Sequence, residues 1–126
     1  MFSDVDDHGL PCSADPLEIL FEDEHFIAIN KPHNLFVHRT NLDRTQLDSA
    51  TQRVRAQLDE AATPVHRLDR PTSGILLFAR HTDAIRRMNT LFSERLVQKE
   101  YIALVRGYVD QEGIIDYPLK HKTKLQ

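Results

Sequence analysis

One stretch of the chain joins a charged turn to its most apolar run: His66-Arg67-Leu68-Asp69-Arg70-Pro71-Thr72-Ser73-Gly74-Ile75-Leu76-Leu77-Phe78-Ala79. A continuous apolar run that follows a turn, here over 74–79, indicates a buried central β-strand. Pro71 favours an extended backbone at Arg70, and Gly74 permits a sharp entry into the strand. We therefore expect Asp69 to lie at the end of the sheet and not within it.

The spacing of apolar residues elsewhere predicts further strands and two helices. Further strands are expected over 17–21, 26–29, 99–106 and 114–116. The first two form a predicted hairpin, and helices are expected over 46–58 and from Thr82 onwards. This order of elements predicts a mixed sheet with helices packed on it, in an α+β or α/β domain.

Both predicted helices have a start signal and one apolar face. Thr45 and Asp48 fit a capping box before the first helix, and Thr82 can cap the second. The apolar faces consist of Leu47, Ala50, Val54 and Leu58 in the first helix and of Ile85, Met88, Phe92 and Leu96 in the second. We expect both faces to lie in the core.

Length and composition are those of one soluble globular domain. The chain has 126 residues, of which 40% are hydrophobic and 28% charged, which argues against collagen-like and disordered classes. No stretch approaches the ~20 apolar residues that cross a bilayer, and the N-terminus lacks the pattern of a secretory signal. Cys12 is the only cysteine, which excludes an intramolecular disulfide. We expect a cytoplasmic protein with no membrane partner.

The charges are unevenly distributed along the chain. The net charge is −3, yet residues 1–24 hold eight acidic and no basic residues. The remaining 102 residues hold 16 basic and 11 acidic ones, a net charge of +5. Such asymmetry is a weak indication of a surface that faces a polyanion. The alternative is an ordinary mixed surface whose charges face water.

Asp69 is the residue whose surroundings are most unusual. It lies between Arg67 and Arg70, whose guanidinium groups favour an ionised neighbour. An anion at this place can act as a nucleophile or a base, while the arginines face phosphates. The alternative is a structural ion pair in which an arginine and Asp69 tie the turn together.

Four segments of the chain resemble RluA-type pseudouridine synthases. The stretch from His66 to Gly74 is similar to the family signature H-R-L-D-R-x-T-S-G. Three further segments resemble family motifs in the same order, namely Asn30-Lys31-Pro32 with Val37-His38, then Lys99 to Gly107 with its tyrosine, then Asp116-Tyr117-Pro118-Leu119. The likeness covers about 17–120. Residues 38–44 and the Asp-Arg-Pro form of the signature most resemble a group that modifies uridine 65 of tRNA.

The resemblance implies an α+β fold with a largely antiparallel sheet and an isomerisation of RNA uridine that needs no cofactor. Asp69 aligns with the essential aspartate of the family, whose chemical route the sequence leaves open. Tyr101 aligns with the tyrosine that stacks on the target base, and Arg67 with the arginine that fills the space left by the flipped nucleotide. Contacts with RNA, most readily tRNA and alternatively rRNA, are expected from Arg67, Arg70, His66 and Lys31. For Lys31, an exposed turn position is an equal alternative.

Other expectations concern the extent of the chain and competing functions. The composition of residues 1–16, with no apolar period, predicts a flexible acidic tail. The resemblance implies that 17–126 is the N-terminal part of a longer catalytic domain, whose open sheet edge could support a dimer. A non-catalytic RNA-binding remnant is one competing function. A glycosidase-like hydrolase, which needs a second carboxylate near Asp69, is another. We expect no metal site, because His33, His38 and His66 lack compact ligand spacing.

Overall fold

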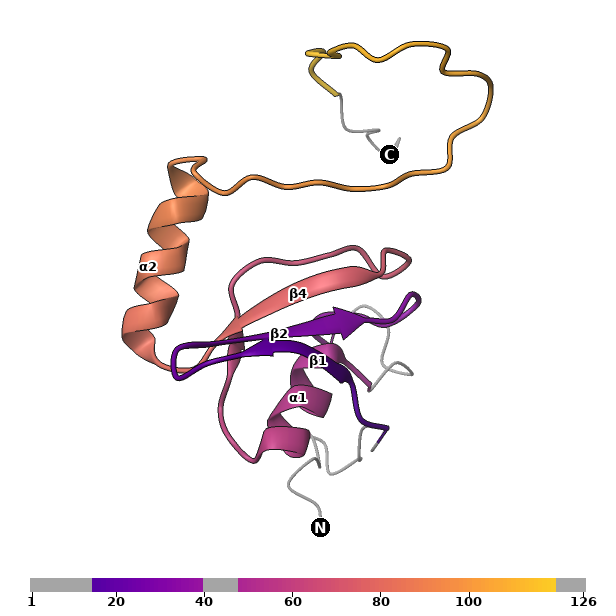
Figure 1. Cartoon of the computed structure of the whole chain (residues 1–126). Coiled ribbons are helices and arrows are strands. Elements are labelled where there is room, and N and C mark those ends of the chain that lie inside the picture. Colours follow the sequence, from indigo (N-terminus) through magenta and orange to yellow (C-terminus); the bar gives the residue numbers. More distant parts are fainter. Residues whose placement is uncertain (1–14, 40–47, 120–126) are drawn as a thin grey trace, which may run out of the picture.

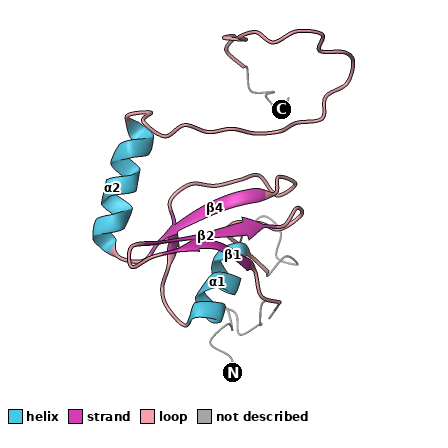
Figure 2. Cartoon of the chain, viewed as in Figure 1, coloured by secondary structure: helices cyan, strands magenta, loops and turns pink. Residues whose placement is uncertain are grey.

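The computed structural model describes residues 15–39 and 48–119. The described elements, in chain order, are β1 (Glu18–Glu22), β2 (Phe26–Lys31), α1 (Ala50–Leu58), β3 (Thr63–Pro64), β4 (Gly74–Ala79) and α2 (Thr82–Ser93) (Figure 2). Strands and helices thus form an α+β domain, as predicted. The expectations for 1–14, for Thr40 to Leu47 and for 120–126 fall outside the described residues.

The four strands form one antiparallel sheet in the order β1-β2-β4-β3 (Figure 1). The predicted hairpin is confirmed as β1 and β2, and the predicted central strand is confirmed as β4. Strand β4 pairs with β2 along its whole length, from Lys31 opposite Gly74 to Phe26 opposite Ala79. Strand β3 escaped prediction because it has two residues, one of them a proline that cannot donate to the ladder.

One face of the sheet carries the core. Ile27 and Ile29 of β2 lie in a buried cluster with Leu76 and Phe78 of β4. Helix α1 contributes Ala50 and Val54 to the same cluster and lies against this face (Figure 1). The alternation along β4 is clear at Ile75, which is 64% exposed on the other face, beside Leu76, which is fully buried. Strand β4 is therefore central in the sheet but buried fully on one face only.

Helix α1 begins later than the capping box predicted. Its N-cap is Ser49, whose side chain accepts a hydrogen bond from the backbone N–H of Gln52 at 3.2 Å. The N–H groups of Ala50 and Thr51 donate to the carbonyls of residues 36 and 37 at 2.8 and 3.0 Å. The free N–H groups of the first helical turn therefore find their acceptors in a segment remote in sequence. The local sequence pattern cannot predict such acceptors.

The apolar face of helix α2 is not core, contrary to the prediction. Only Ala84 of this helix is buried, while Ile85, Met88 and Phe92 are half-buried. Leu96 lies beyond the helix and is 63% exposed. The N-cap is His81, one residue before the predicted cap. Figure 1 shows α2 standing beside the end of the sheet instead of lying across it. The apolar face of this helix is therefore buried only in part.

The strands predicted over 99–106 and 114–116 are absent from the described residues. The chain from 97 to 119 carries no strand and runs as an extended segment outside the sheet (Figure 1). Ile102 and Leu104 are fully exposed there. The apolar pattern of a strand is present in this segment, but a strand forms only where a neighbouring backbone pairs with it.

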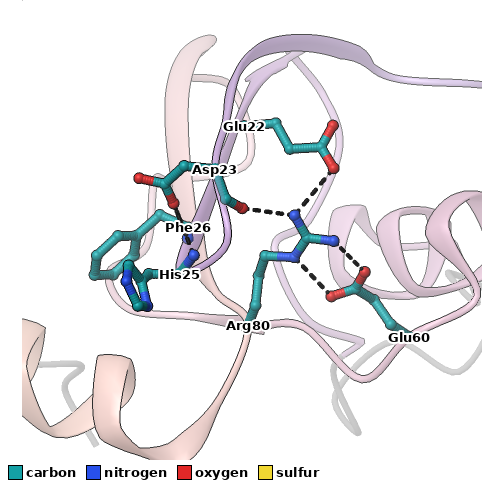
Figure 3. A network of polar contacts seen from close by, with 6 residues as sticks. All are labelled: Glu22, Asp23, His25, Phe26, Glu60 and Arg80. Carbon is teal, nitrogen blue, oxygen red and sulfur yellow. Dashed lines mark hydrogen bonds and ion pairs between the residues drawn. The ribbon is translucent and has the colours of Figure 1, made fainter.

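Arg80 fastens three parts of the fold just beyond β4 (Figure 3). Its guanidinium group donates to both carboxylate oxygens of Glu60, at 2.7 and 3.0 Å. It also donates to Glu22 at 3.0 Å and to the carbonyl oxygen of Asp23 at 2.6 Å. The turn between β1 and β2 and the loop after α1 are thereby tied to the end of β4.

Neither described helix combines the length and apolar character needed to cross a bilayer.

The two faces of β4 predict losses of stability of different size on truncation. Leu76→Ala is expected to lower the free energy of unfolding by about 2–5 kcal/mol, because it removes fully buried methyl groups. Ile75→Ala, at the neighbouring exposed position, is expected to cost less than about 1 kcal/mol. Urea denaturation followed by circular dichroism measures both losses, and equal losses would contradict the assignment of the two faces.

Candidate active site

The signature loop, residues 66–74, is anchored at both ends and in its middle. At its start, His66 Nε2 accepts a hydrogen bond from the backbone N–H of Leu77 at 3.0 Å. Leu68 points into the core cluster. The N–H of Thr72 donates to the carbonyl of Asp69 at 2.9 Å, which closes a tight turn. Gly74 then enters β4 with φ of 127°, a left-handed backbone that favours glycine.

The buried side chain of Lys31 contacts the backbone of this loop. This position corrects both predictions for Lys31, a contact with RNA and an exposed turn residue. The side chain is fully buried, so it is neither an exposed turn residue nor placed to contact a phosphate. Its ammonium group donates to the carbonyls of Pro32 at 2.9 Å, Leu35 at 2.6 Å and Arg70 at 3.1 Å. Burial lowers the pKa of this group. Lys31 therefore joins the segment after β2 to the signature loop.

Asn34 adds a second tie to the same carbonyl. Its backbone N–H donates to the carbonyl oxygen of Arg70 at 2.7 Å, and its φ of 66° is left-handed. Asparagine tolerates this conformation better than most residues. With Lys31, it uses both acceptor positions of the Arg70 carbonyl. Lys31 belongs to the Asn30-Lys31-Pro32 motif of the sequence analysis and Asn34 lies just beyond it, but their partner 36 or more residues away gave no signal.

Asp69 is exposed at the end of the sheet, as expected, on a loop whose backbone is fixed around it. Within 15–39 and 48–119, no cation forms an ion pair with its carboxylate. The alternative of an arginine–Asp69 pair that ties the turn is therefore wrong. The turn is held by backbone and Lys31 contacts instead, which leaves the carboxylate available to a ligand.

The two signature arginines occupy different surroundings. The Arg70 guanidinium lies over the ring of Phe36, 4.7 Å from its centroid, and its buried Nε has no hydrogen-bond partner among the described residues. Arg67 is exposed and lies close enough to His38 for its charge to act there. Partial burial lowers the pKa of His38, and the charges of Arg55 and Arg67 lower it further. The loop is thus bordered by positive charge.

His66 has a packing role that the sequence did not indicate. Its ring stacks on Phe92 of α2, with centroids 5.5 Å apart and an interplanar angle of 27°. Burial lowers the pKa of His66 below the ordinary 6.5, and the charge of Lys99 adds to this effect. The neutral ring suits the acceptor role toward Leu77. A contact between His66 and RNA stays a prediction.

Tyr101 forms no hydrogen bond with Asp69 within the described residues. Its side chain is 62% exposed on the extended segment after α2, and it forms no hydrogen bond or ring contact with the described residues. In the described part of the chain, no group of three or more histidine, cysteine or acidic side chains could hold a metal ion.

Comparison with known proteins assigns the fold and the loop to one family. Residues 25–126 match the sequence family described as RNA pseudouridylate synthase. The chain is 50% identical over 104 residues to the tRNA pseudouridine synthase C of Haemophilus ducreyi and 49% identical to that of Pasteurella multocida. Each match covers 82% of this chain and 43% of the relative. The chain therefore spans less than half the length of these relatives.

A solved structure is similar as well. The human RNA pseudouridylate synthase domain-containing protein 1 matches with a TM-score of 0.53 and 26% identity, over 68% of this chain and 31% of that one. The described α+β fold is thus similar to that of another RNA pseudouridylate synthase domain. The chain belongs to the RNA pseudouridylate synthase family, as the resemblance of its signature indicated.

Removal of the Lys31 ammonium group is expected to loosen the signature loop. Lys31→Met keeps the length of the side chain but leaves three carbonyl oxygens without their donor. The expected loss of stability is about 1–3 kcal/mol, with faster hydrogen exchange at the N–H of Asn34. Lys99→Met, at an exposed position, is the control and should stay within about 0.5 kcal/mol. Unchanged exchange at Asn34 would contradict the tie.

The lowered pKa of His66 predicts a loss of stability in mild acid. Because the folded chain favours neutral His66, the unfolded chain binds more protons as the pH falls below about 6.5. The free energy of unfolding should therefore fall as the pH drops from 7.5 towards 5. His66→Gln should reduce this fall, and the remainder should include His38, whose pKa is also lowered. Urea denaturation at several pH values measures the slope, and an equal slope in the variant would refute the assignment.

Proposed function

We propose that this chain carries the catalytic aspartate of an enzyme that converts uridine to pseudouridine in RNA, with tRNA as the substrate. The observation that carries the proposal is the exposed carboxylate of Asp69, which has no ion-pair partner among the described residues. Lys31, Asn34 and Leu68 fix the loop around it, so the carboxylate stands at a defined place. A fixed backbone under a free acidic group is what positioning for catalysis requires.

The proposed reaction rearranges one nucleotide and consumes no cofactor. The bond between N1 of uracil and C1′ of ribose breaks, the base rotates, and C5 bonds to C1′. C5 loses its hydrogen as a proton and N1 gains a proton, so product and substrate are isomers. An ionised Asp69 can attack the ribose, attack the base or remove a ribose proton, and all three routes need an exposed carboxylate.

Exposed groups on the signature loop and on the segment after α2 suit contacts with a flipped nucleotide. Flipping costs a few kcal/mol, and stacking of a base on an aromatic ring returns about 1–3 kcal/mol. We assign the stacking to Tyr101, whose ring is exposed. We assign Arg67 to the space that the nucleotide leaves and Arg70 to the neighbouring phosphates, which the positive border of the loop favours.

The names of the similar proteins support tRNA over rRNA as the substrate. Uridine 65 is the specific position we propose, from the likeness of residues 38–44 to the group that modifies it. Residues 40–44 lie outside the described part of the chain.

A second candidate function is RNA binding without catalysis. The observation that favours it is that Tyr101 is exposed and forms no hydrogen bond or ring contact with the signature loop within the described residues. Under this alternative Asp69 is dispensable, and the affinity for RNA depends steeply on salt because it rests on phosphate contacts.

Release of tritium from tRNA labelled at C5 of uridine distinguishes these functions. The wild-type chain is expected to release tritium, because formation of the new C–C bond expels the C5 hydrogen. Asp69→Asn should reduce release at least about a hundredfold, since it removes the reacting group. Asp110→Asn, an equal change at an exposed residue of the extended segment, should leave release unchanged.

The other outcomes assign other functions. RNA binding by both wild type and Asp69→Asn, with no tritium released by either, would reject catalysis by this chain and favour the binding function. Release of free uracil in place of pseudouridine would instead indicate a hydrolase.

A further inference from the structure

A small hollow lies at the end of the sheet opposite to the signature loop. It is lined by His25, Phe26, His81, Asp83, Ala84 and Arg87. His25 lies in the turn before β2 and Phe26 begins β2, while His81 is the N-cap of α2 and the other three lie in the first half of that helix. Lys31 opposes Gly74 at one end of the β2–β4 pair and Phe26 opposes Ala79 at the other. Six strand residues separate the hollow from the start of β4, a span of about 20 Å.

The ring nitrogens of the two histidines are all occupied. The N–H of Ala84 donates to His81 Nδ1 at 3.2 Å, so the proton of this ring is on Nε2. That Nε2 donates to His25 Nδ1 at 2.8 Å. The remaining nitrogen of His25 then carries a proton and faces Glu24 at 3.4 Å. No lone pair is left to ligate a metal, and the rings are held in place with their faces free.

The walls of the hollow are aromatic. The His25 ring meets His81 edge-on at 5.0 Å between centroids, and meets Phe26 edge-on at 6.4 Å. In Figure 3 the His25 and Phe26 rings lie together, on the side of the turn away from the Arg80 guanidinium. Aromatic faces held rigidly at a surface are the usual platform for an unpaired nucleobase.

The charges around the hollow fit a nucleotide. Arg87 is exposed and has no ion-pair partner among the described residues, so its charge is available to a phosphate. Two carboxylates also face this region. Asp83 lies 3.8 Å from Arg86, and Glu24 lies beside His25. Asp83 can accept a hydrogen bond from an exocyclic amino group of a base, which a simple anion lacks.

We propose that this hollow binds one unpaired nucleotide of the RNA substrate, with its base against the rings of His25, Phe26 and His81 and its phosphate at Arg87. The inference rests on the proposed RNA substrate and adds a second contact, several nucleotides away from the target uridine. Its role is to align the RNA along the sheet while Asp69 acts at the other end.

Two pairs of matched variants test the contact in the full chain with a tRNA transcript. Phe26→Leu removes an aromatic wall and should weaken binding at least about fivefold. Phe21→Leu, at an exposed position of β1 outside the hollow, should not. Arg87→Gln should weaken binding and reduce the salt dependence by about one phosphate contact. Arg95→Gln removes the same charge from an exposed position just beyond the same helix and should have no such effect.

Equal weakening by both members of either pair would overturn the proposal, because general electrostatics or loss of folding would then explain the result.

Titration of the ¹⁵N-labelled chain with uridine and adenosine 5′-monophosphates gives a second measurement that needs no intact RNA complex. Amide signals of Phe26, Ala84 and Arg87 should shift with the nucleotides but not with inorganic phosphate. Equal shifts with phosphate, or no shifts, would also overturn it. Tritium release by the wild type decides the proposed function separately.

Discussion

The buried ammonium group of Lys31 is the contact on which the candidate site depends. A charged group inside a fold is costly unless its hydrogen bonds are satisfied. Lys31 meets this requirement with three carbonyl oxygens, two from the segment just after β2 and one from Arg70. Two loops that are 35 residues or more apart must therefore be in place together. The signature loop is shaped from below by this contact and not by ion pairs at its surface.

Some charged side chains of this fold form structural contacts, and others remain exposed and available to a ligand. Every polar contact of Arg80 serves the fold, since its donors are taken by Glu60, Glu22 and a backbone carbonyl. Asp69 and Arg87, by contrast, are exposed and without ion-pair partners among the described residues. Between them lies the β2–β4 pair, the most regular part of the sheet. A rigid pair of strands with a free group at each end suits the alignment of an extended polymer.

Predictions from sequence were confirmed for elements that depend on neighbouring residues. They were wrong for elements that need a hydrogen-bond partner far away in the sequence. The β1–β2 hairpin and β4 followed from short apolar runs bounded by turn residues. The start of α1 was misplaced because Ser49 and the carbonyls of residues 36 and 37 complete its first turn. The segment 99–106 has a strand pattern but no described strand, because no described backbone pairs with it. For the site, the signature identified the family and placed Asp69 at the end of the sheet.

The sequence by itself determined the family, the order of the central elements and the position of Asp69 next to its apolar strand, because these are carried by contiguous residues. Only the tertiary structure decided that Lys31 is buried, that Asp69 has no ion pair within 15–39 and 48–119, that His66 packs on α2, and that His25 and His81 share a hydrogen bond. Each of these depends on contacts between residues far apart along the chain. The free energy of such contacts comes from burial and hydrogen bonding in three dimensions, and neither is encoded in the spacing of neighbouring residues.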